Sequence, residues 1–213
     1  VTKKGIVKKI KLSSFNNPRK NGIKAIKLKD DEVVRVVLVK DDSEIIIATK
    51  NGMAIKFKSK DIRETGRNAS GVRGIRVKND EVIGMEIAEN DILTITEKGY
   101  GKRTQVNEYR LTRRGGKGVT NIKITEKNGK VVGIKTVNEN NEVMIITAKG
   151  VIIRIKVSNI SEVGRNTQGV RLIRLKDNDK VKDLSKVLIN DQSPWSIFIP
   201  SGFKEYDESM NFL

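Results

Sequence analysis

One stretch of the sequence, residues 109–118, combines positive charge with a backbone that carries few side chains. It reads Tyr-Arg-Leu-Thr-Arg-Arg-Gly-Gly-Lys-Gly, and Arg113, Arg114 and Lys117 place three cations within five residues. The glycines between them let a backbone approach another surface closely and adopt φ > 0. Guanidinium and ammonium groups on such a loop are suited to binding a polyanion. A solvated turn can have the same composition, so the stretch gains weight only if its charge recurs.

The charge does recur, in a segment that the chain repeats four times. Each copy has a glycine followed by apolar residues at offsets 1, 4 and 6, and offset 5 is always basic. Offset 2 is basic in three copies, with Thr120 as the exception. At offsets 4 to 6 apolar and basic residues alternate, as they do in a half-buried strand. The apolar residue at offset 1 would lie on the opposite face of a continuous strand from those at offsets 4 and 6, which predicts a bend near offset 3. The copies cover 21–28, 70–77, 117–124 and 168–175, and their basic positions are Lys24, Lys27, Arg73, Arg76, Lys123, Arg171 and Arg174.

A Thr-x-x-Gly turn precedes each of these segments. The turn glycines are Gly5, Gly52, Gly99 and Gly150, and apolar residues flank the turns, which predicts a β-hairpin at each. A second basic row stands four residues after each glycine. If the repeats stack or form a ring, both rows become stripes that match the regular spacing of backbone phosphates. The second row comprises Lys9, Lys56, Arg103 and Arg154.

These repeats predict an all-β fold. A further short apolar strand closes each unit, near residues 33, 82, 131 and 181, and no long helical periodicity occurs. Four strands in about 47 residues indicate a propeller-like disc of four-stranded blades, of which about four repeats are visible. We place them at residues 1–44, 45–91, 92–142 and 143–188. The first unit has no counterpart of residues 45–47, so we expect either an upstream start of the domain or a strand donated from elsewhere in the chain.

Composition narrows the classes of function. The chain has 213 residues, 43 Lys and Arg against 26 Asp and Glu, a net charge of +17 and a pI near 10.0, which favours an anionic partner. An alternative is that an AT-rich genome has merely enriched lysine. The absence of Cys and His excludes disulfides, thiolate zinc sites and His-based triads. No apolar run approaches the roughly 20 residues of a membrane span, and no signal peptide is visible, so we expect a cytoplasmic protein without a membrane partner.

The C-terminal residues 189–213 differ from the repeats. The region from residue 183 onward carries more acids than lysines and contains five of the nine aromatic residues. We predict a C-terminal tail that caps the last repeat. An alternative hypothesis is autoregulation, in which Glu205, Asp207 and Glu208 compete with an anionic ligand.

Duplex DNA is the nucleic acid that fits best. Residues 1–182 hold only four aromatic residues, too few for the stacking platforms of single-strand binders, and no recognition helix is visible. A basic perimeter without base-reading elements suits a duplex held by its phosphates and bent. Acidic pairs such as Asp30 and Asp31 fall in expected loops, so we predict no catalytic residue, metal or cofactor in this chain.

Three motifs resemble the C-terminal domain of DNA gyrase A, of the type IIA topoisomerase family. They are Thr-Glu-Lys-Gly-Tyr-Gly-Lys-Arg at 96–103, Gly-Arg-Asn-Ala-Ser-Gly-Val-Arg at 66–73 and Gly-Arg-Asn-Thr-Gln-Gly-Val-Arg at 164–171. The resemblance implies a β-pinwheel whose basic rim wraps duplex DNA and positions it for strand passage and negative supercoiling. It also implies that the partners are the rest of gyrase A and gyrase B in a heterotetramer associated with the bacterial nucleoid, and that catalysis, ATP and Mg²⁺ belong to other domains. The motifs add Lys102, Arg67 and Arg165 to the predicted DNA contacts.

The family's hallmark box is Gln-Arg-Arg-Gly-Gly-Lys-Gly. Here Thr112 replaces the glutamine, whereas residues 113–118 match. The family has this box in its first blade, and here it lies in the third visible repeat, so the box proper is expected upstream of Val1. Two alternatives stay open: the corresponding domain of topoisomerase IV, and a basic β-propeller that binds another protein.

Overall fold

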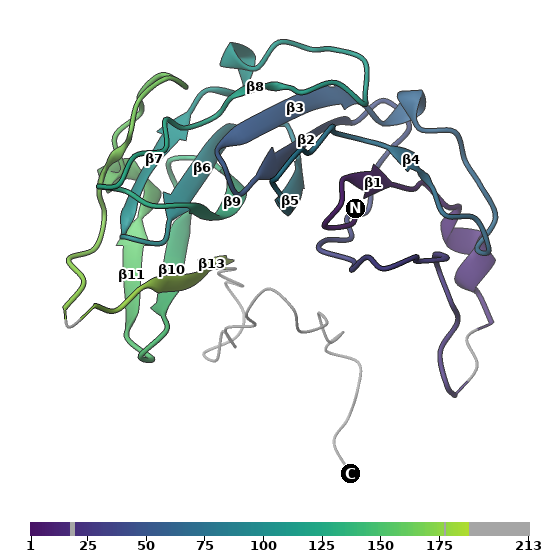
Figure 1. Cartoon of the computed structure of the whole chain (residues 1–213), viewed down its shortest axis with the longest axis horizontal. Helices are drawn as coiled ribbons and strands as arrows, with labels where there is room; N and C mark the ends of the chain where they lie inside the picture. Colours follow the sequence, from purple (N-terminus) through teal and green to yellow (C-terminus); the bar gives the residue numbers. More distant parts are fainter. Residues whose placement is uncertain (18–19, 177, 188–213) are drawn as a thin grey trace.

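The computed structural model describes residues 1–17, 20–176 and 178–187, and the predicted tail at 189–213 lies outside these ranges. The described residues form β-strands joined by turns and four short 3₁₀ helices, which confirms the all-β prediction. None of the helices in this part of the chain has the length and apolar character needed to span a lipid bilayer. The sheets follow one another along an open arc (Figure 1).

Two complete blades lie in the middle of the arc, and each is a four-stranded antiparallel sheet. The first has the order β5-β2-β3-β8, and the second has the order β9-β6-β7-β12. In each, the outermost strand comes from the following repeat, because β8 and β12 are the first residues of the basic segments. The strands are β2 (Glu44–Thr49), β3 (Met53–Lys58), β5 (Val82–Ile87), β8 (Val119–Thr120), β6 (Asp91–Thr96), β7 (Tyr100–Thr104), β9 (Val131–Val137) and β12 (Val170–Arg171).

The sheets at the two ends are smaller. The last has three strands in the order β13-β10-β11, with β10 (Glu142–Thr147), β11 (Ile152–Lys156) and β13 (Val181–Val187). The first is a two-stranded sheet of β1 (Ile6–Val7) and β4 (Val72–Arg73), beside a bridge between Thr2 and Val33. Within the described ranges, no strand pairs with the outer edge of β11. The basic segment of the first repeat, residues 21–28, likewise joins no sheet.

The Thr-x-x-Gly turn explains why each hairpin forms. The glycine N–H donates to the threonine carbonyl, for example from Gly52 to Thr49 at 3.0 Å, and the glycine has φ near +80°. In the first, second and fourth repeats the threonine hydroxyl accepts the N–H of the residue after the glycine, as Thr49 does from Met53 at 3.2 Å. In the third repeat the hydroxyl of Thr96 instead donates to the carbonyl of Tyr100 at 3.2 Å. Glycine adopts this left-handed conformation without steric cost. The predicted hairpins are therefore confirmed for the second, third and fourth repeats.

The repeated basic segment differs from the strand that its alternation predicts. Only its first two residues after the glycine pair as a strand, and the next two N–H groups both point at one carbonyl. Thus Gly74 and Ile75 donate to the oxygen of Gly5 at 2.8 and 3.3 Å. This bend at offset 3 is as predicted. The strand expected at offsets 4 to 6 is absent from the described segments, although the offset-4 isoleucines Ile75, Ile122 and Ile173 are buried in the core.

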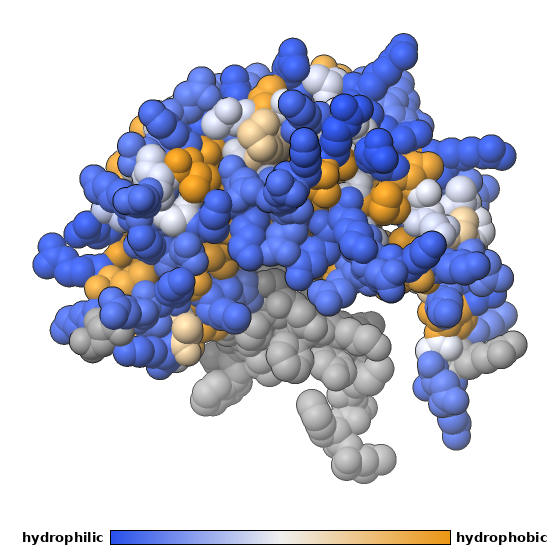
Figure 2. Space-filling view, in the orientation of Figure 1, coloured by the Kyte–Doolittle hydropathy of each residue, from blue (hydrophilic) through white to orange (hydrophobic). Residues whose placement is uncertain are grey.

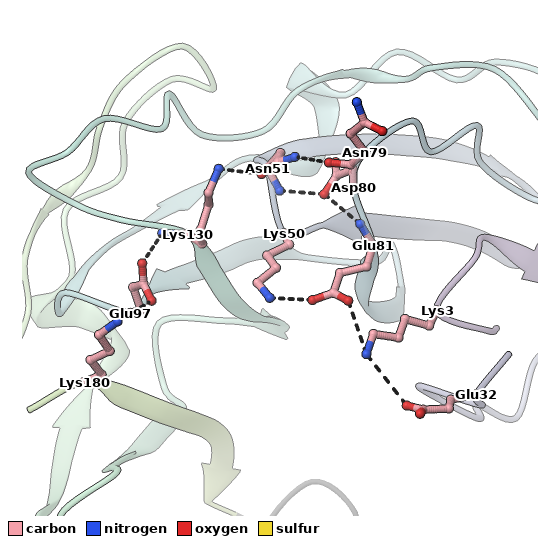
Figure 3. A network of polar contacts seen from close by, with 10 residues as sticks. All are labelled: Lys3, Glu32, Lys50, Asn51, Asn79, Asp80, Glu81, Glu97, Lys130 and Lys180. Carbon is pink, nitrogen blue, oxygen red and sulfur yellow. Dashed lines mark hydrogen bonds and ion pairs between the residues drawn. The ribbon is translucent and has the colours of Figure 1, made fainter. Parts of the chain in front are cut away.

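Adjacent repeats are joined at their hairpin turns by polar contacts (Figure 3). The carboxylate of Glu81 forms ion pairs with Lys50 at 2.5 Å and with Lys3, in the preceding turn, at 3.2 Å. Further along, Lys130 donates to Asn51 at 2.7 Å, and Glu97 pairs with Lys180 at 3.4 Å. Backbone bonds run in parallel with these contacts, with donors Val82, Val131 and Val181 and acceptors Lys3, Lys50 and Glu97. The blades are therefore fixed relative to one another along the arc.

The elements β5, β9 and β13 lie on the concave side of the arc and β8 lies on the convex side (Figure 1). The buried apolar side chains form three clusters. One of them surrounds Phe57 and includes Ile75, the offset-4 isoleucine of the same repeat. A second surrounds Leu93 and includes Ile173, the offset-4 isoleucine of the following repeat. The last three basic segments are thus anchored in the core at offset 4, while their first residues lie at the outer edge of a sheet. The four 3₁₀ helices follow the hairpins: η1 (Leu12–Phe15), η2 (Ser59–Asp61), η3 (Val106–Glu108) and η4 (Val157–Asn159).

Candidate nucleic-acid interface

The cations at offsets 2 and 5 of the basic segments are all exposed. This holds for every residue that the sequence pattern singled out at these offsets: Lys24, Lys27, Arg73, Arg76, Lys123, Arg171 and Arg174. Three of the segments begin at the outer strands β4, β8 and β12. The face seen in Figure 2 is covered largely by hydrophilic residues, with small apolar areas between them.

Backbone hydrogen bonds place these segments in one continuous row. In three successive repeats, the offset-5 N–H donates to a carbonyl in the loop that precedes the next segment. The pairs are Lys27 to Ala69 at 3.1 Å, Arg76 to Gly116 at 2.8 Å and Lys123 to Thr167 at 2.9 Å. Each basic loop therefore lies beside the basic segment of the previous repeat. The structure brings the loop cations and the offset-2 and offset-5 cations together along the outer edge, which we call the basic rim.

Two arginines of the rim loops join neighbouring repeats. Arg114 donates from Nη1 to the carbonyl of Arg73 at 3.0 Å and from Nε to that of Asp61 at 2.9 Å. Arg165 has the same place in the next loop, and its Nη1 donates to the carbonyl of Thr120 at 2.9 Å. Both side chains are half-buried, whereas Arg67, Arg113 and Lys117 are exposed. Arg114 and Arg165 thus bind the protein as well as adding charge.

The glycines of the 112–118 loop allow it to pack closely against its neighbours. The N–H of Gly115 donates to the carbonyl of Gly74 at 2.6 Å. Gly118 has φ +78°, and a Cβ there would lie 2.1 Å from the carbonyl oxygen of Ala54 in β3. A side chain cannot fit at that distance. The loop is thereby fixed on β3 with its two exposed cations, Arg113 and Lys117, directed outward from the sheet edge.

The second basic row that the sequence suggested is not a stripe of free cations. Lys9 pairs with Asp41 at 3.6 Å, Lys56 pairs with Glu44 at 3.0 Å, and Arg154 pairs with Glu142. Arg103 is 8% exposed and contacts Asp91 at 3.2 Å, Glu139 at 3.0 Å and Glu162 at 3.9 Å. The placement of these four residues on a phosphate-binding stripe is therefore not supported. A sequence signal was available, because Glu44, Asp91 and Glu142 each open the first strand of a hairpin.

Lys102 is fully buried and cannot reach a ligand at the surface. Its ammonium group donates to the carbonyls of Gly164 at 2.6 Å and Arg165 at 2.8 Å, so it fixes a rim loop from beneath. Lys8 has the same position in the first repeat, which sequence analysis missed, and binds the carbonyls of Ala25, Arg67 and Ala69 at 2.7–2.9 Å. These lysines position the loops instead of contacting the ligand. The equivalent residues of the other repeats are isoleucines.

Burial gives Lys102 a testable pH signature. Desolvation lowers the pKa of its ammonium group to about 8, against about 10.4 in an unfolded chain. Between these values the unfolded state binds more protons, so the contribution of Lys102 to stability rises with pH in this window and is constant outside it. We expect the free energy of unfolding of the wild type, minus that of Lys102→Met, to rise from pH 8 to pH 10. Denaturant unfolding of both proteins at pH 7, 9 and 10 measures it, and a difference independent of pH would contradict the assignment.

Comparison with known proteins places this arrangement in a family. A family model described as the DNA gyrase C-terminal domain, β-propeller, matches residues 1–40, 43–89, 90–138 and 141–187. The A subunit of DNA gyrase from Staphylococcus aureus (strain MRSA252) is 46% identical over 192 residues, which are 87% of this chain and 22% of that protein. The chain therefore spans about a fifth of the length of this relative.

Two solved structures share the fold. A DNA gyrase A C-terminal domain has a TM-score of 0.79 and 30% identity, covering 87% of this chain and 63% of that one. The C-terminal domain of a DNA topoisomerase IV has a TM-score of 0.82 and 27% identity, covering 88% of this chain and 60% of that one. With four matched repeats and the basic rim in place, the chain belongs to the family of DNA gyrase C-terminal domains.

Proposed function

We propose that this chain binds duplex DNA along the basic rim and bends it around the convex side of the arc. The observation that carries the proposal is the hydrogen-bonded succession of basic segments, which aligns exposed cations from every repeat on one edge. Ten residues form the proposed contact set: Lys24, Lys27, Arg67, Arg73, Arg76, Arg113, Lys117, Lys123, Arg171 and Arg174. Arg114 and Arg165 support them from half-buried positions.

The energetics favour binding through phosphates. Bending a site of 20–30 base pairs by 40–90° costs roughly 1–6 kcal/mol. Each phosphate neutralised adds about −0.9 to the slope of log affinity against log salt, so ten contacts give a slope of about −9. At salt concentrations near 0.1 M this electrostatic gain exceeds the cost of bending. Because the contacts go to phosphates, binding is expected to be independent of base sequence.

By family, the role is that of the DNA-wrapping part of gyrase A. The chain presents a crossing segment for strand passage and favours negative supercoiling, together with the rest of gyrase A and with gyrase B. It performs no chemistry itself and needs no cofactor, since cleavage and ATP hydrolysis take place in other domains of a cytoplasmic enzyme. The 46% identity to a gyrase subunit favours gyrase over topoisomerase IV for this role.

Duplex length tests the proposal. Affinity measured by fluorescence titration is expected to rise with length, up to a site of many tens of base pairs, because each repeat adds contacts along a curved path. A basic propeller that binds another protein would hold short and long duplexes almost equally per site. Affinity that reaches its limit at about 15 base pairs would exclude wrapping.

A further inference from the structure

A basic cleft of about 510 Å³ lies between the third and fourth repeats. It opens where the turn between β6 and β7 meets the chain that leads from β12 toward β13. Five cations line it: Lys98, Lys127, Arg171, Arg174 and Lys180. The one carboxylate of its described lining, Asp179, accepts the backbone N–H groups of residues 149 and 180 at 3.1 and 2.8 Å. Positive charge therefore dominates the cleft.

Tyr100 forms one wall and orients two of these cations. The tyrosine is 7% exposed, and its hydroxyl accepts a hydrogen bond from Nη2 of Arg171 at 2.8 Å. The guanidinium of Arg171 lies 5.4 Å from the ring centroid, and Nζ of Lys127 lies 5.6 Å from it. Contacts of this kind restrict a long basic side chain without neutralising its charge. Arg171 and Lys127 are thus preorganised to bind an anion.

The remaining cations differ in how free they are. Lys98 donates to the carbonyl of Glu126, and Lys180 pairs with Glu97 at 3.4 Å. Arg174 and Lys127 are exposed, and neither forms a hydrogen bond or ion pair with any described residue. The charges of Arg174 and Lys127 are therefore unpaired among the described residues, and the Tyr100 ring orients Lys127 and Arg171.

Two residues of the cleft lining, Tyr100 and Lys127, stand at places where the third repeat differs from its neighbours. Tyr100 stands where the other repeats have Ile6, Met53 and Val151, so only this hairpin carries an aromatic residue at that position. The connection that holds Lys127 runs between Ile124 and Val131. Its counterpart, between Val77 and Val82, is two residues shorter. Both the ring and the cation above it thus depend on residues that the neighbouring repeats lack.

We propose that this cleft binds consecutive phosphate groups of a DNA backbone, at a point where the rim grips the duplex more tightly than elsewhere. The inference rests on the proposed function, because Arg171 and Arg174 are the offset-2 and offset-5 cations of the rim and the cleft opens onto the same path. Its volume is that of a small-ligand pocket, so a strand's backbone can enter it and a whole duplex cannot. Phosphates in it would meet an arginine fork and point charges at once.

The test compares two charge-matched double variants of the whole chain. Lys127→Ala with Arg174→Ala removes the free cations of the cleft. Arg76→Ala with Lys78→Ala removes the corresponding rim and connection charges of the second repeat, whose hairpin has Met53 in place of the tyrosine. We expect the cleft variant to lower the magnitude of the salt slope by about 2, and the control to lower it by about 1. At 0.1 M salt this corresponds to an affinity about tenfold lower for the cleft variant than for the control.

A third variant separates preorganisation from charge. Tyr100→Phe keeps the ring and every charge but removes the acceptor for Arg171, so we expect a severalfold loss of duplex affinity at an unchanged melting temperature.

Equal salt slopes and affinities in the two double variants, with steep salt dependence in the wild type, would overturn the cleft proposal alone. A wild type that binds no duplex would overturn the proposed function as well.

The source of the phosphate is tested with inorganic pyrophosphate by calorimetry. We expect no saturable binding below millimolar concentration. Tight pyrophosphate binding that the Lys127→Ala and Arg174→Ala variant loses, with duplex affinity unchanged, would assign the cleft to a free phosphate ligand and overturn the DNA contact.

Discussion

Alanine at five exposed rim positions together is expected to lower duplex affinity by about a thousandfold or more at 0.1 M salt. The positions are Arg73, Arg76, Arg113, Lys117 and Lys123, which lie in adjacent repeats. Each phosphate contact adds about 0.9 to the magnitude of the salt slope, so five lost contacts lower it by roughly 4 to 5. Electrophoretic or fluorescence titration of a duplex longer than about 100 base pairs at several salt concentrations measures both quantities.

Arg114 is left out of this variant because its guanidinium joins two repeats, and its loss would change the fold together with the charge. The control is Lys182→Ala with Lys186→Ala in β13, on the concave side of the arc (Figure 1). Its salt slope is expected to equal that of the wild type. If the loss per charge were the same in the control as in the rim variant, general electrostatic attraction would explain binding and the rim would have no special role.

Gly118→Ala is expected to destabilise the chain by about 2–4 kcal/mol. The residue has φ +78°, and the new Cβ would lie 2.1 Å from the carbonyl oxygen of Ala54, a backbone atom that can move only with β3. Left-handed strain for a non-glycine residue and overpacking each cost about 1–3 kcal/mol. Because Gly118 immediately precedes β8, the change also disturbs the strand that the third repeat adds to the blade of the second.

Two glycines provide matched controls for that variant. Gly150 has φ +81°, but a Cβ added there would have no atom within 4 Å, so Gly150→Ala measures the cost of the backbone conformation alone. Gly116 has no positive φ, and the nearest neighbour of an added Cβ would be Cδ1 of Ile55 at 3.6 Å, so Gly116→Ala should be almost neutral. Thermal unfolding ranks the three. Equal losses for Gly118→Ala and Gly150→Ala would show that close packing of the loop on β3 contributes nothing.

The regular parts of the fold were predictable because their signals are local. A Thr-x-x-Gly turn between apolar runs defines its own hydrogen bonds, and the structure has the hairpins β2–β3, β6–β7 and β10–β11 at those turns. The exchange of β8 and β12 into neighbouring sheets was not predictable, since each pairing involves two residues and no periodicity can be read from so short a strand. The strand predicted at offsets 4 to 6 was wrong because one carbonyl, such as that of Gly5, captures two successive N–H groups.

The candidate site was predictable in outline only. The position of a residue in the repeat correctly predicted that Arg73 and Arg76 are exposed. The same reasoning was wrong for Lys56 and Arg103, which are 7% and 8% exposed and are paired with acids. Repetition shows that a residue type is needed at a position and does not show which side chain faces solvent. The buried role of Lys102 depends on carbonyls more than 60 residues away, beyond the reach of any sequence pattern.

The central claim is that rim cations from successive repeats hold one curved duplex, and DNA topology tests it most directly. A nicked circular DNA is incubated with the chain, sealed by ligase and freed of protein, and its linking number is read on a gel. The account predicts a shift of the topoisomer distribution that grows with the amount of protein and disappears in the five-residue rim variant. A distribution identical to that of DNA sealed without protein, under conditions where the chain is bound, would contradict it.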